Sequence, residues 1–250
     1  MSKKSSSQLL KGSQSSRSRI LVQVCVAVVL ILLIGAIGVS IAVKKSHKDR
    51  QEADRVAAAK GPDVIAGTGL RVGNPDSKVV VSIVEDLQCP SCKLFEDQAS
   101  GAIEEMIGSG KVAIEYRTIS FLDRASSTNY SSRAANASAC VAEADMSKWF
   151  SWHQAMFKNQ PEENSAGLPD DRLIAIAREQ GVNGQGAADC IANQKYADFV
   201  KSSTKKWFVD AGIQGTPTVF VNGAEIHHNN DPKLLPSVDD LKAAVAKAQV

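Results

Sequence analysis

Two cysteines, Cys89 and Cys92, are separated by two residues and stand at the junction of two sequence patterns. Residues 78–84 are mostly valine and isoleucine and predict a buried strand. The residues from about 93 to 107 predict a helix. The sequence therefore places two thiols at a strand-to-helix turn, and this constrains the fold more than any other feature of the chain.

The start of a helix favours a thiolate. Its first backbone N–H groups have no partner inside the helix, and the helix dipole adds a partial positive charge. Pro90 suits the first turn, because its missing N–H costs nothing there. We therefore expect Cys89 to be the low-pKa nucleophile and Cys92, one turn further on, to close the ring. A Cys-x-x-Cys pair in this position is typical of a thioredoxin-like redox centre.

Two alternatives for the cysteine pair are a zinc site and a purely structural disulfide. Zinc would need two more cysteine or histidine ligands, usually as a second closely spaced pair. Cys140 and Cys190 are not such a pair. His227 and His228 are adjacent, so on a strand they would point to opposite faces. A structural disulfide this short would restrain the unfolded chain little. We favour a redox role and expect no metal and no cofactor.

An apolar run near the N-terminus predicts a membrane anchor. Residues 20–43 contain no charged side chain, and only Gln23 and Ser40 are clearly polar. A helix needs about 20 apolar residues to span a bilayer. The run is longer than the core of a signal peptide, about 7–15 residues, and no small-residue cleavage site stands out after it. We expect a single transmembrane helix over residues 20–43 that holds the chain in the lipid bilayer.

The orientation of this anchor follows from what comes after it. Basic residues on the two flanks nearly balance, so the positive-inside rule does not decide the orientation. An N-terminal anchor followed by a large domain usually exports the domain, and four downstream cysteines suit an oxidising compartment. We expect residues 1–19 to be a disordered cytoplasmic tail and residues 44–66 to be a linker. Residues 44–250 would then lie outside the cell membrane.

The charges divide the chain in the same way. Residues 1–60 hold 11 basic and 3 acidic residues, which leaves 18 basic against 24 acidic residues in the remainder. The basic residues of the first part suit the membrane flanks, where they face anionic lipid. The acidic remainder argues against nucleic acid as a partner.

The pattern of elements predicts one α/β domain over residues 67–250. After the first strand and helix, residues 111–117 alternate and predict a second strand. Residues from about 125 to 212 contain helical patterns but no good strand. Residues 217–221 predict a strand before an Asn-Gly turn, which is a strong hairpin signal, and a last helix begins at Ser237. This order predicts a thioredoxin fold with an inserted helical subdomain.

Three segments of the chain resemble the DsbA-like thiol:disulfide oxidoreductases in content, order and spacing. Residues 84–92 carry the Cys-Pro-Ser-Cys motif, residues 148–161 an aromatic helical stretch, and residues 212–223 a Gly-Thr-Pro-Thr sequence before an apolar strand. The resemblance covers roughly residues 67–250. With the anchor and the extra cysteine pair, the chain is similar to membrane-anchored actinobacterial members of that family.

The resemblance implies a role for Pro217. The matching residue in the family is a cis-proline that faces the active disulfide. A cis bond before proline costs only about 0.5–1 kcal/mol relative to trans. The turn would leave the backbone of Thr216 exposed beside Cys89, where an extended substrate could pair with it as an added strand. The alternative is an ordinary trans-proline at the start of a strand.

Four exported cysteines allow three pairings. If Cys89 and Cys92 are the redox pair, Cys140 and Cys190 form the remaining bridge. That bridge closes a loop of about 50 residues and would contribute about 4 kcal/mol on the chain-entropy model. Two buried free thiols are the alternative in a reducing compartment.

Compared with the strongest oxidants of the family, the chain departs in two positions around the active site. Ser91 stands where a histidine is often found, so one group that stabilises the thiolate is missing. Ile83 stands where this fold commonly has a buried acid, and Glu85 and the acid after it lie at other spacings. Losing the histidine raises the Cys89 pKa and losing the acid at this position lowers it, so the sequence does not give the sign of the sum. We expect a Cys89 pKa below about 7, a potential more oxidising than that of thioredoxin, and a structural role for His153 in the core.

The function implied by these residues is the donation of the Cys89–Cys92 disulfide to unfolded exported proteins with cysteine thiols. By family resemblance, a membrane quinone-linked partner would re-oxidise the pair. A reductase or isomerase on the same fold is the first alternative. A non-catalytic chaperone or metal-binding tether is the second, and the intact Cys-x-x-Cys motif argues against it.

Overall fold

The computed structural model describes residues 38–39, 41–56, 59–66 and 69–249. The chain divides into two compact units, residues 1–55 and 56–250. In the first unit the described residues from 41 onward are helical and exposed, so the segment expected to be a linker begins as a helix. Within the described ranges, no helix is both long and apolar enough to cross a membrane. The anchor expected over residues 20–43 and the tail before it fall almost entirely outside those ranges.

The second unit is built on a mixed six-stranded sheet with the strand order β1-β2-β4-β3-β5-β6. The strands are β1 (Ile65–Ala66), β2 (Gly69–Gly73), β3 (Val79–Glu85), β4 (Val112–Thr118), β5 (Thr218–Val221) and β6 (Ala224–Glu225). β3 pairs in parallel with β4, and the other neighbouring strands are antiparallel. The parallel β3–β4 pair needs a crossover, which is the helix that follows the cysteine motif.

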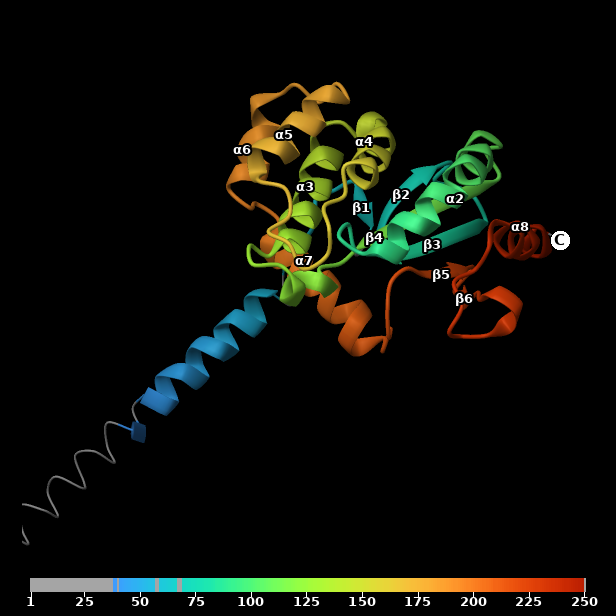
Figure 1. The fold of residues 1–250 in the computed structure, drawn as a ribbon. Coiled ribbons are helices and arrows are strands. Elements are labelled where there is room, and N and C mark those ends of the chain that lie inside the picture. The colour runs from blue at the N-terminus through green and yellow to red at the C-terminus, as the bar shows by residue number, and fades with distance from the viewer. Residues whose placement is uncertain (1–37, 40, 57–58, 67–68, 250) are drawn as a thin grey trace, which may run out of the picture. The chain divides into compact units, whose positions relative to one another are not determined.

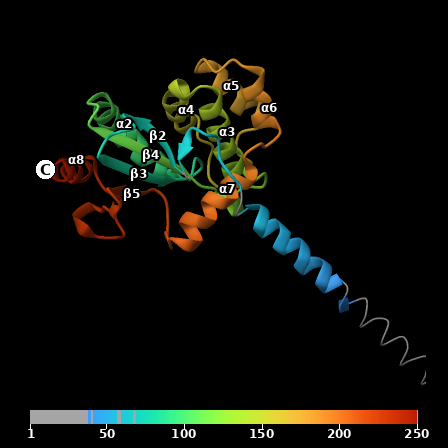
Figure 2. The same cartoon turned by 180° about the vertical axis from the view of Figure 1, so that it is seen from behind.

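Helices complete the unit in two groups. The helices are α2 (Pro90–Gly108), α3 (Tyr130–Ala144), α4 (Met146–Lys158), α5 (Asp170–Glu179), α6 (Gln185–Ala192), α7 (Ala197–Thr204) and α8 (Val238–Ala248). Both ribbon views show α3 to α6 gathered as a bundle beside the sheet (Figures 1 and 2). α2 packs against α8, against β4 and against α4 of the bundle. The thioredoxin fold with a helical insertion is therefore confirmed.

The apolar core follows from the alternation of side chains in β3. Val81 and Ile83 are fully buried on one side, in the large cluster that includes α2, α4 and α8. Val84 points to the other side, into a smaller cluster with Ile119 and Ile213. Both faces of β3 are covered, as its unbroken apolar run predicts. The packing on both faces therefore holds the C-terminal end of β3, and the turn after it, in a fixed position.

Local signals mark several element ends. Ser237 caps α8 in a capping box with Asp240, as the sequence predicts. The helical pattern near residues 196–211 is split, because α7 gives way to the π-helical segment η2 (Lys205–Asp210). The hydroxyl of Thr204 donates to the carbonyl of Val200 at 2.8 Å, and bonding of this kind bends helices. The 3₁₀ segments η1 (Phe121–Ala125) and η3 (His228–Asn230) have no signal that the sequence interpretation used.

Candidate active site

The two cysteines of the motif lie at the turn between β3 and α2. Cys89 is the residue before the first turn of α2, and Pro90 occupies that first turn. The Cys89 N–H donates to the Asp86 carbonyl at 3.0 Å, and the Cys89 carbonyl accepts from the N–H of Lys93 at 3.1 Å. Both thiols are free. The positions of Cys89, Pro90 and Cys92 agree with the strand-to-helix turn that the sequence predicts.

Cys89 is the more accessible thiol, and its surroundings favour the thiolate. Its sulfur lies 3.3 Å from the carbonyl oxygen of Thr216, and the Thr216–Pro217 peptide bond is cis. A hydrogen bond from the Cys92 thiol lowers the pKa of Cys89 to about 6 against the effect of burial. The side chain of Thr216 and the N–H groups of Ser91 and Cys92 lower it further.

Cys92 is the opposite case. Only 1% of its surface is exposed. Burial raises its pKa well above the usual range, and so do the hydrogen bond to Cys89 and the negative charge of Glu85. One thiol of the pair is thus ionised near neutral pH while the other keeps its proton.

Asp86 holds the turn that carries Cys89. Its carboxylate is fully buried and accepts hydrogen bonds from the Gln88 N–H at 2.8 Å, the Leu122 N–H at 2.8 Å and the Ser131 hydroxyl at 2.7 Å. Burial raises the pKa of Asp86 to about 6, and these hydrogen bonds oppose that rise. The residue ties the turn to η1 and to α3, a role that the sequence interpretation missed.

Gln160 forms a second tie between the insertion and the motif. Its side-chain amide donates to the carbonyl oxygens of Leu87 at 3.1 Å and Cys89 at 3.0 Å. The residue follows α4 and lies within residues 148–161, a segment that carries the family resemblance. Its position next to a proline, at the end of an aromatic helix, is the sequence signal that could have identified it.

The position of Ile83 carries no acid, but other positions bring carboxylates close to the redox pair. Glu85, Asp86 and Glu96 are all buried. Glu85 ends β3, and its Oε1 accepts a hydrogen bond from the Nε2 of His153 at 2.7 Å. The sequence indicates Glu85 and Asp86 as the nearest acids but gives no sign of Glu96, which lies on α2. His153 lies in the core as expected, but it is also paired with an acid.

Glu85, Glu96 and His153 are also the described residues that most resemble a metal-binding group. Their potential ligand atoms lie within 4.8 Å of one another, and all three side chains are buried. The two histidines considered as zinc ligands do not join the cysteines. His228 bonds to Asp240 through Nδ1 at 2.7 Å, and His227 lines a groove.

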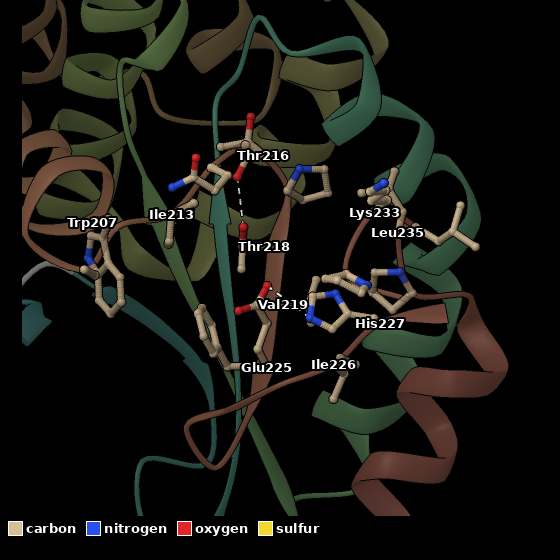
Figure 3. Close-up of a pocket in the computed structure, with 18 of the residues that line it drawn as sticks. Trp207, Ile213, Thr216, Thr218, Val219, Glu225, Ile226, His227, Lys233 and Leu235 are labelled. Atoms are coloured by element: carbon tan, nitrogen blue, oxygen red, sulfur yellow. Dashed lines mark hydrogen bonds and ion pairs between the residues drawn. The ribbon is translucent and has the colours of Figure 1, made fainter. Parts of the chain in front are cut away.

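This groove adjoins the cis-proline loop. It has a volume of about 560 Å³ and lies between residues 211–220 and residues 232–236. Figure 3 shows Trp207 and Ile213 on one side of β5, and His227 and Leu235 on the other. Thr216 stands at its edge. An extended, partly apolar peptide could therefore lie beside the Cys89 sulfur.

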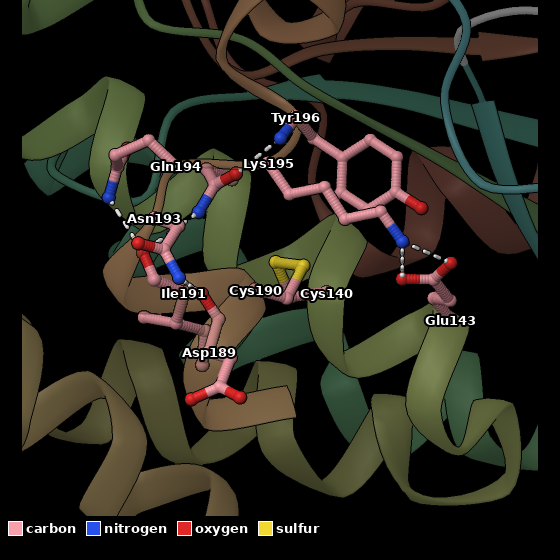
Figure 4. The surroundings of a disulfide bond; sticks show 10 residues. Cys140, Glu143, Asp189, Cys190, Ile191, Asn193, Gln194, Lys195 and Tyr196 are labelled. Atoms are coloured by element: carbon pink, nitrogen blue, oxygen red, sulfur yellow. Dashed lines mark hydrogen bonds and ion pairs between the residues drawn. A yellow bond between two sulfur atoms is a disulfide. The ribbon is translucent and has the colours of Figure 1, made fainter. Parts of the chain in front are cut away.

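The second cysteine pair is bridged. Cys140 of α3 and Cys190 of α6 form a disulfide with a Cα–Cα distance of 5.7 Å, which is the pairing left after the redox motif is set aside. Figure 4 shows the bridge between the two helices, near the ion pair of Lys195 with Glu143. The bridge fastens two helices of the insertion and takes no part in the motif.

Comparison with known proteins gives a consistent result. The family model described as Thioredoxin matches residues 66–240. The chain is 33% identical to the reduced DsbA of Mycobacterium tuberculosis, with a TM-score of 0.57 and coverage of 73% of this chain and 100% of that one. It is also 33% identical to DsbG of the same organism, with a TM-score of 0.59 and coverage of 80% and 99%.

A curated relative of a different kind matches a smaller share of its own length. The chain is 31% identical over 180 residues to the serine/threonine-protein kinase PknE of Mycobacterium tuberculosis. The match covers 68% of this chain and 31% of the kinase, so the chain spans about a third of that relative.

Proposed function

The chain belongs to the thioredoxin family, among its DsbA- and DsbG-type thiol:disulfide oxidoreductases, and from that premise we propose that it donates the Cys89–Cys92 disulfide to exported proteins that carry cysteine thiols. The observation that carries the proposal is the opposite behaviour of the two thiols. The pKa of Cys89 is lowered to about 6, whereas that of the buried Cys92 is raised. A stable Cys89 thiolate favours the reduced form of the pair, and this makes the disulfide an oxidant.

The reaction proceeds through a mixed disulfide. A substrate thiolate attacks the sulfur of Cys89, the Cys89–Cys92 bond breaks, and Cys92 leaves as a thiolate that takes up a proton. A second substrate thiolate then attacks the substrate sulfur and releases the Cys89 thiolate. The substrate loses two electrons and gains a disulfide, while the protein gains two electrons and becomes a dithiol.

The groove beside the motif supports an unfolded protein as substrate. Trp207 and Leu235 give it apolar contact surface. Thr216 is only 8% exposed and its carbonyl accepts from the Cys89 thiol, so an extended chain would pair with this backbone only once that hydrogen bond is released. A shallow apolar groove of this kind binds extended polypeptide without requiring one particular sequence. This suits an enzyme that acts on many unfolded proteins.

The proposed location is the cell membrane, with the sheet domain on the extracytoplasmic side. The uncharged residues 20–43 would anchor the chain in the bilayer. The Cys140–Cys190 disulfide supports an oxidising compartment for the domain. A membrane quinone-linked partner would return the Cys89–Cys92 pair to the disulfide after each donation.

A trapping experiment on the full chain tests the proposal. With Cys92→Ser, a mixed disulfide at Cys89 can no longer be released by attack of Cys92 on the Cys89 sulfur, and we expect Cys89 to accumulate mixed disulfides with exported proteins. The matched control, Cys89→Ser, should trap none. Alkylation of the wild-type protein in cells should find the Cys89–Cys92 pair mostly oxidised. A pair found mostly reduced would contradict donation and favour the reductase or isomerase, and a pair protected by a bound metal would favour the tether.

A further inference from the structure

A surface rich in aromatic and basic side chains lies where α7 gives way to η2. We call it the η2 surface, and it consists of Phe121 and Arg124 of η1 and of Lys206, Trp207, Phe208 and Val209 of η2. We propose that the η2 surface docks on a bilayer that contains anionic lipids, with its apolar side chains among the headgroups and its basic side chains on the phosphates. The inference rests on the proposed membrane anchor and goes beyond the proposed disulfide donation.

Val209 is the side chain of this surface that packing of the core does not explain. It is 65% exposed, the largest fraction among the exposed large apolar side chains of the described residues. A single exposed valine is ordinary, but this one follows Trp207 and Phe208, which are both only half-buried. Both ribbon views show the helix that continues from α7 into η2 projecting from the rest of the sheet domain (Figures 1 and 2). A projecting group of apolar side chains of this kind indicates an interaction site.

The aromatic rings of the η2 surface are held in place by the domain. Trp207 and Phe121 both pack against the smaller apolar cluster, which includes Val84 of β3. Phe208 lies against Phe121, with ring centroids 4.6 Å apart. η2 is a π-helical turn, a form that is rare and often occurs at functional sites. Because the rings are already ordered, docking costs little side-chain entropy.

Basic groups lie over the faces of these rings. The Cζ atom of Arg124 is 4.7 Å from the centroid of the Phe121 ring, and the Nζ atom of Lys206 is 5.6 Å from the Trp207 ring. Both side chains are long and end in solvent, so their charged ends can turn to lipid phosphates while their stems stay on the rings. The η2 surface thus presents apolar area and positive charge side by side.

The charge of the domain makes a basic face necessary for contact with anionic lipid. Residues 61–250 hold 18 basic and 24 acidic residues, so an anionic bilayer repels the domain as a whole. The acids beside the η2 surface are already engaged: Asp210 pairs with Lys205 at 2.6 Å, and Asp123 accepts from the N–H of Ser132 at 2.8 Å. Tryptophan together with lysine and arginine is the combination that proteins place at the bilayer interface.

The proposed anchor favours a bilayer over a soluble partner as the occupant. Residues 20–43 carry no charge and are proposed to span the membrane, and the short segment 44–64 connects them to β1. A tether of this length keeps the domain at a high effective concentration beside the lipid, so that weak contacts are sufficient for docking. An acidic protein surface is the competing occupant.

Docking through the η2 surface brings the reactive thiol close to the membrane. Trp207 also lines the groove beside the cis-proline loop, and Thr216 stands at the edge of that groove (Figure 3). The Thr216 carbonyl oxygen lies 3.3 Å from the Cys89 sulfur. The surface and the groove therefore share one residue, and a docked domain holds the groove next to the bilayer, where an exported chain emerges.

The tryptophans of the chain supply a selective probe of docking. Trp149 and Trp152 are fully buried, Trp207 is half-buried, and residues 20–43 contain no tryptophan. The full chain is reconstituted in vesicles whose lipids carry bromine near the headgroup, which quenches tryptophan fluorescence on contact. We expect quenching in vesicles of equal parts phosphatidylglycerol and phosphatidylcholine, and little in phosphatidylcholine alone. The quenching should fall at high salt, because salt screens the attraction.

Variants identify the groups that make the contact. Lys206→Gln and Arg124→Gln should each lower the ratio of docked to undocked chain about fivefold, the effect of one positive charge near an anionic surface. Val209→Asp should abolish the quenching. Lys247→Gln, the same change at an exposed position on α8, is the matched control and should have no effect. The thermal unfolding midpoint of each variant checks that it is folded.

Flotation of the vesicles reports the anchor separately from the η2 surface. A wild-type chain that floats with both kinds of vesicle but is not quenched by phosphatidylglycerol overturns the proposal and leaves the anchor intact. Equal quenching in both kinds of vesicle overturns the role of the basic side chains. A chain that floats and is quenched only with phosphatidylglycerol supports the surface and refutes the anchor.

A crosslinking experiment in native membranes decides between lipid and protein as the occupant. With Val209 replaced by a photoreactive amino acid, the full chain should crosslink to lipid. Crosslinking to a protein instead would overturn the proposal in favour of an acidic partner. Glutathione exchange at Cys89 in the same samples reports the thiol chemistry, so its loss would refute the proposed function and not the η2 surface.

Discussion

The two cysteine pairs of the sheet domain are equally buried and chemically opposite. The exposed fractions are 8% and 1% for Cys89 and Cys92, and 1% and 7% for Cys140 and Cys190. Yet the first pair is free and the second is bridged. Burial therefore does not decide which pair exchanges and which one stays closed.

The surroundings of the two pairs explain the difference. Cys89 lies at the start of a 19-residue helix, where the N–H groups of Ser91 and Cys92 stabilise its thiolate. The Cys140–Cys190 bridge joins two helices, and the nearby Glu143 is neutralised by Lys195 at 2.6 Å. The two pairs also differ in sequence separation, which is three positions in one case and 50 in the other. One pair is thus arranged for reactivity and the other for restraint.

The largest expected effect on stability comes from removing the Cys140–Cys190 disulfide. Replacing both Cys140 and Cys190 with alanine removes a crosslink with a sequence separation of 50. We expect the free energy of unfolding to fall by about 4 kcal/mol on the chain-entropy model, while glutathione exchange at Cys89 stays within about twofold. Denaturant unfolding of the oxidised chain and the exchange rate measure the two quantities. Loss of exchange with unchanged stability would reverse the roles assigned to the two pairs.

The next effect is the pH dependence of the reactive pair. The pKa of Cys89 falls from 9.0 to about 6, so the thiolate contributes its full stabilisation of the reduced form above about pH 9. That stabilisation is lost as the pH falls through about 6. At pH 7 it amounts to about 1.4 kcal/mol, which corresponds to roughly 30 mV of oxidising power.

This prediction is measured by the thiolate absorbance of the reduced chain, with the oxidised chain as the blank. We expect one transition near pH 6 from Cys89, while Cys92 remains protonated across that range. The bridged pair contributes no transition. A single midpoint near 8.5, the value of an ordinary cysteine, would remove the basis for calling the pair an oxidant.

Local sequence signals were sufficient to predict the fold and the positions of the Cys89 and Cys92 thiols. The apolar run of β3, the proline after Cys89 and the Asn-Gly turn after β5 each act within a few residues, so the sequence alone indicates them. The cis bond at Pro217 needed the family resemblance, because Thr-Pro by itself is compatible with either isomer. These features are the ones for which neighbouring residues determine the geometry.

The polar contacts around the site could not be predicted from the sequence in the same way. Glu85 and His153 are 68 positions apart and meet at 2.7 Å only because α4 packs on α2 next to the end of β3. Gln160 reaches Leu87 across 73 positions. The sequence contains the residues but not the rotation of α4 about its axis, and that rotation decides which side chains face the motif. The aromatic residues at helical spacing around His153 are equally consistent with an apolar core in which the histidine has no acidic partner.

Replacing Gln160 is expected to have the smallest effect on stability. It tests whether a side chain of the insertion positions the reactive cysteine pair. Gln160→Ala removes two hydrogen bonds, to the carbonyl oxygens of Leu87 and Cys89. We expect the free energy of unfolding to fall by about 1 kcal/mol, since each lost bond contributes modestly and solvent can reach part of this site. Gln154→Ala on α4 is the matched control and should change stability less.

The same variant tells whether the insertion holds the reactive turn in place or only covers it. If the two bonds position the turn, Gln160→Ala should also change the rate at which glutathione reacts with Cys89, while the Cys140–Cys190 bridge stays closed under the same conditions. A fall in stability with no change in that rate would mean that Gln160 fastens the insertion without positioning the thiol. In that case Asp86, which accepts hydrogen bonds from η1 and α3, is the tie that positions Cys89.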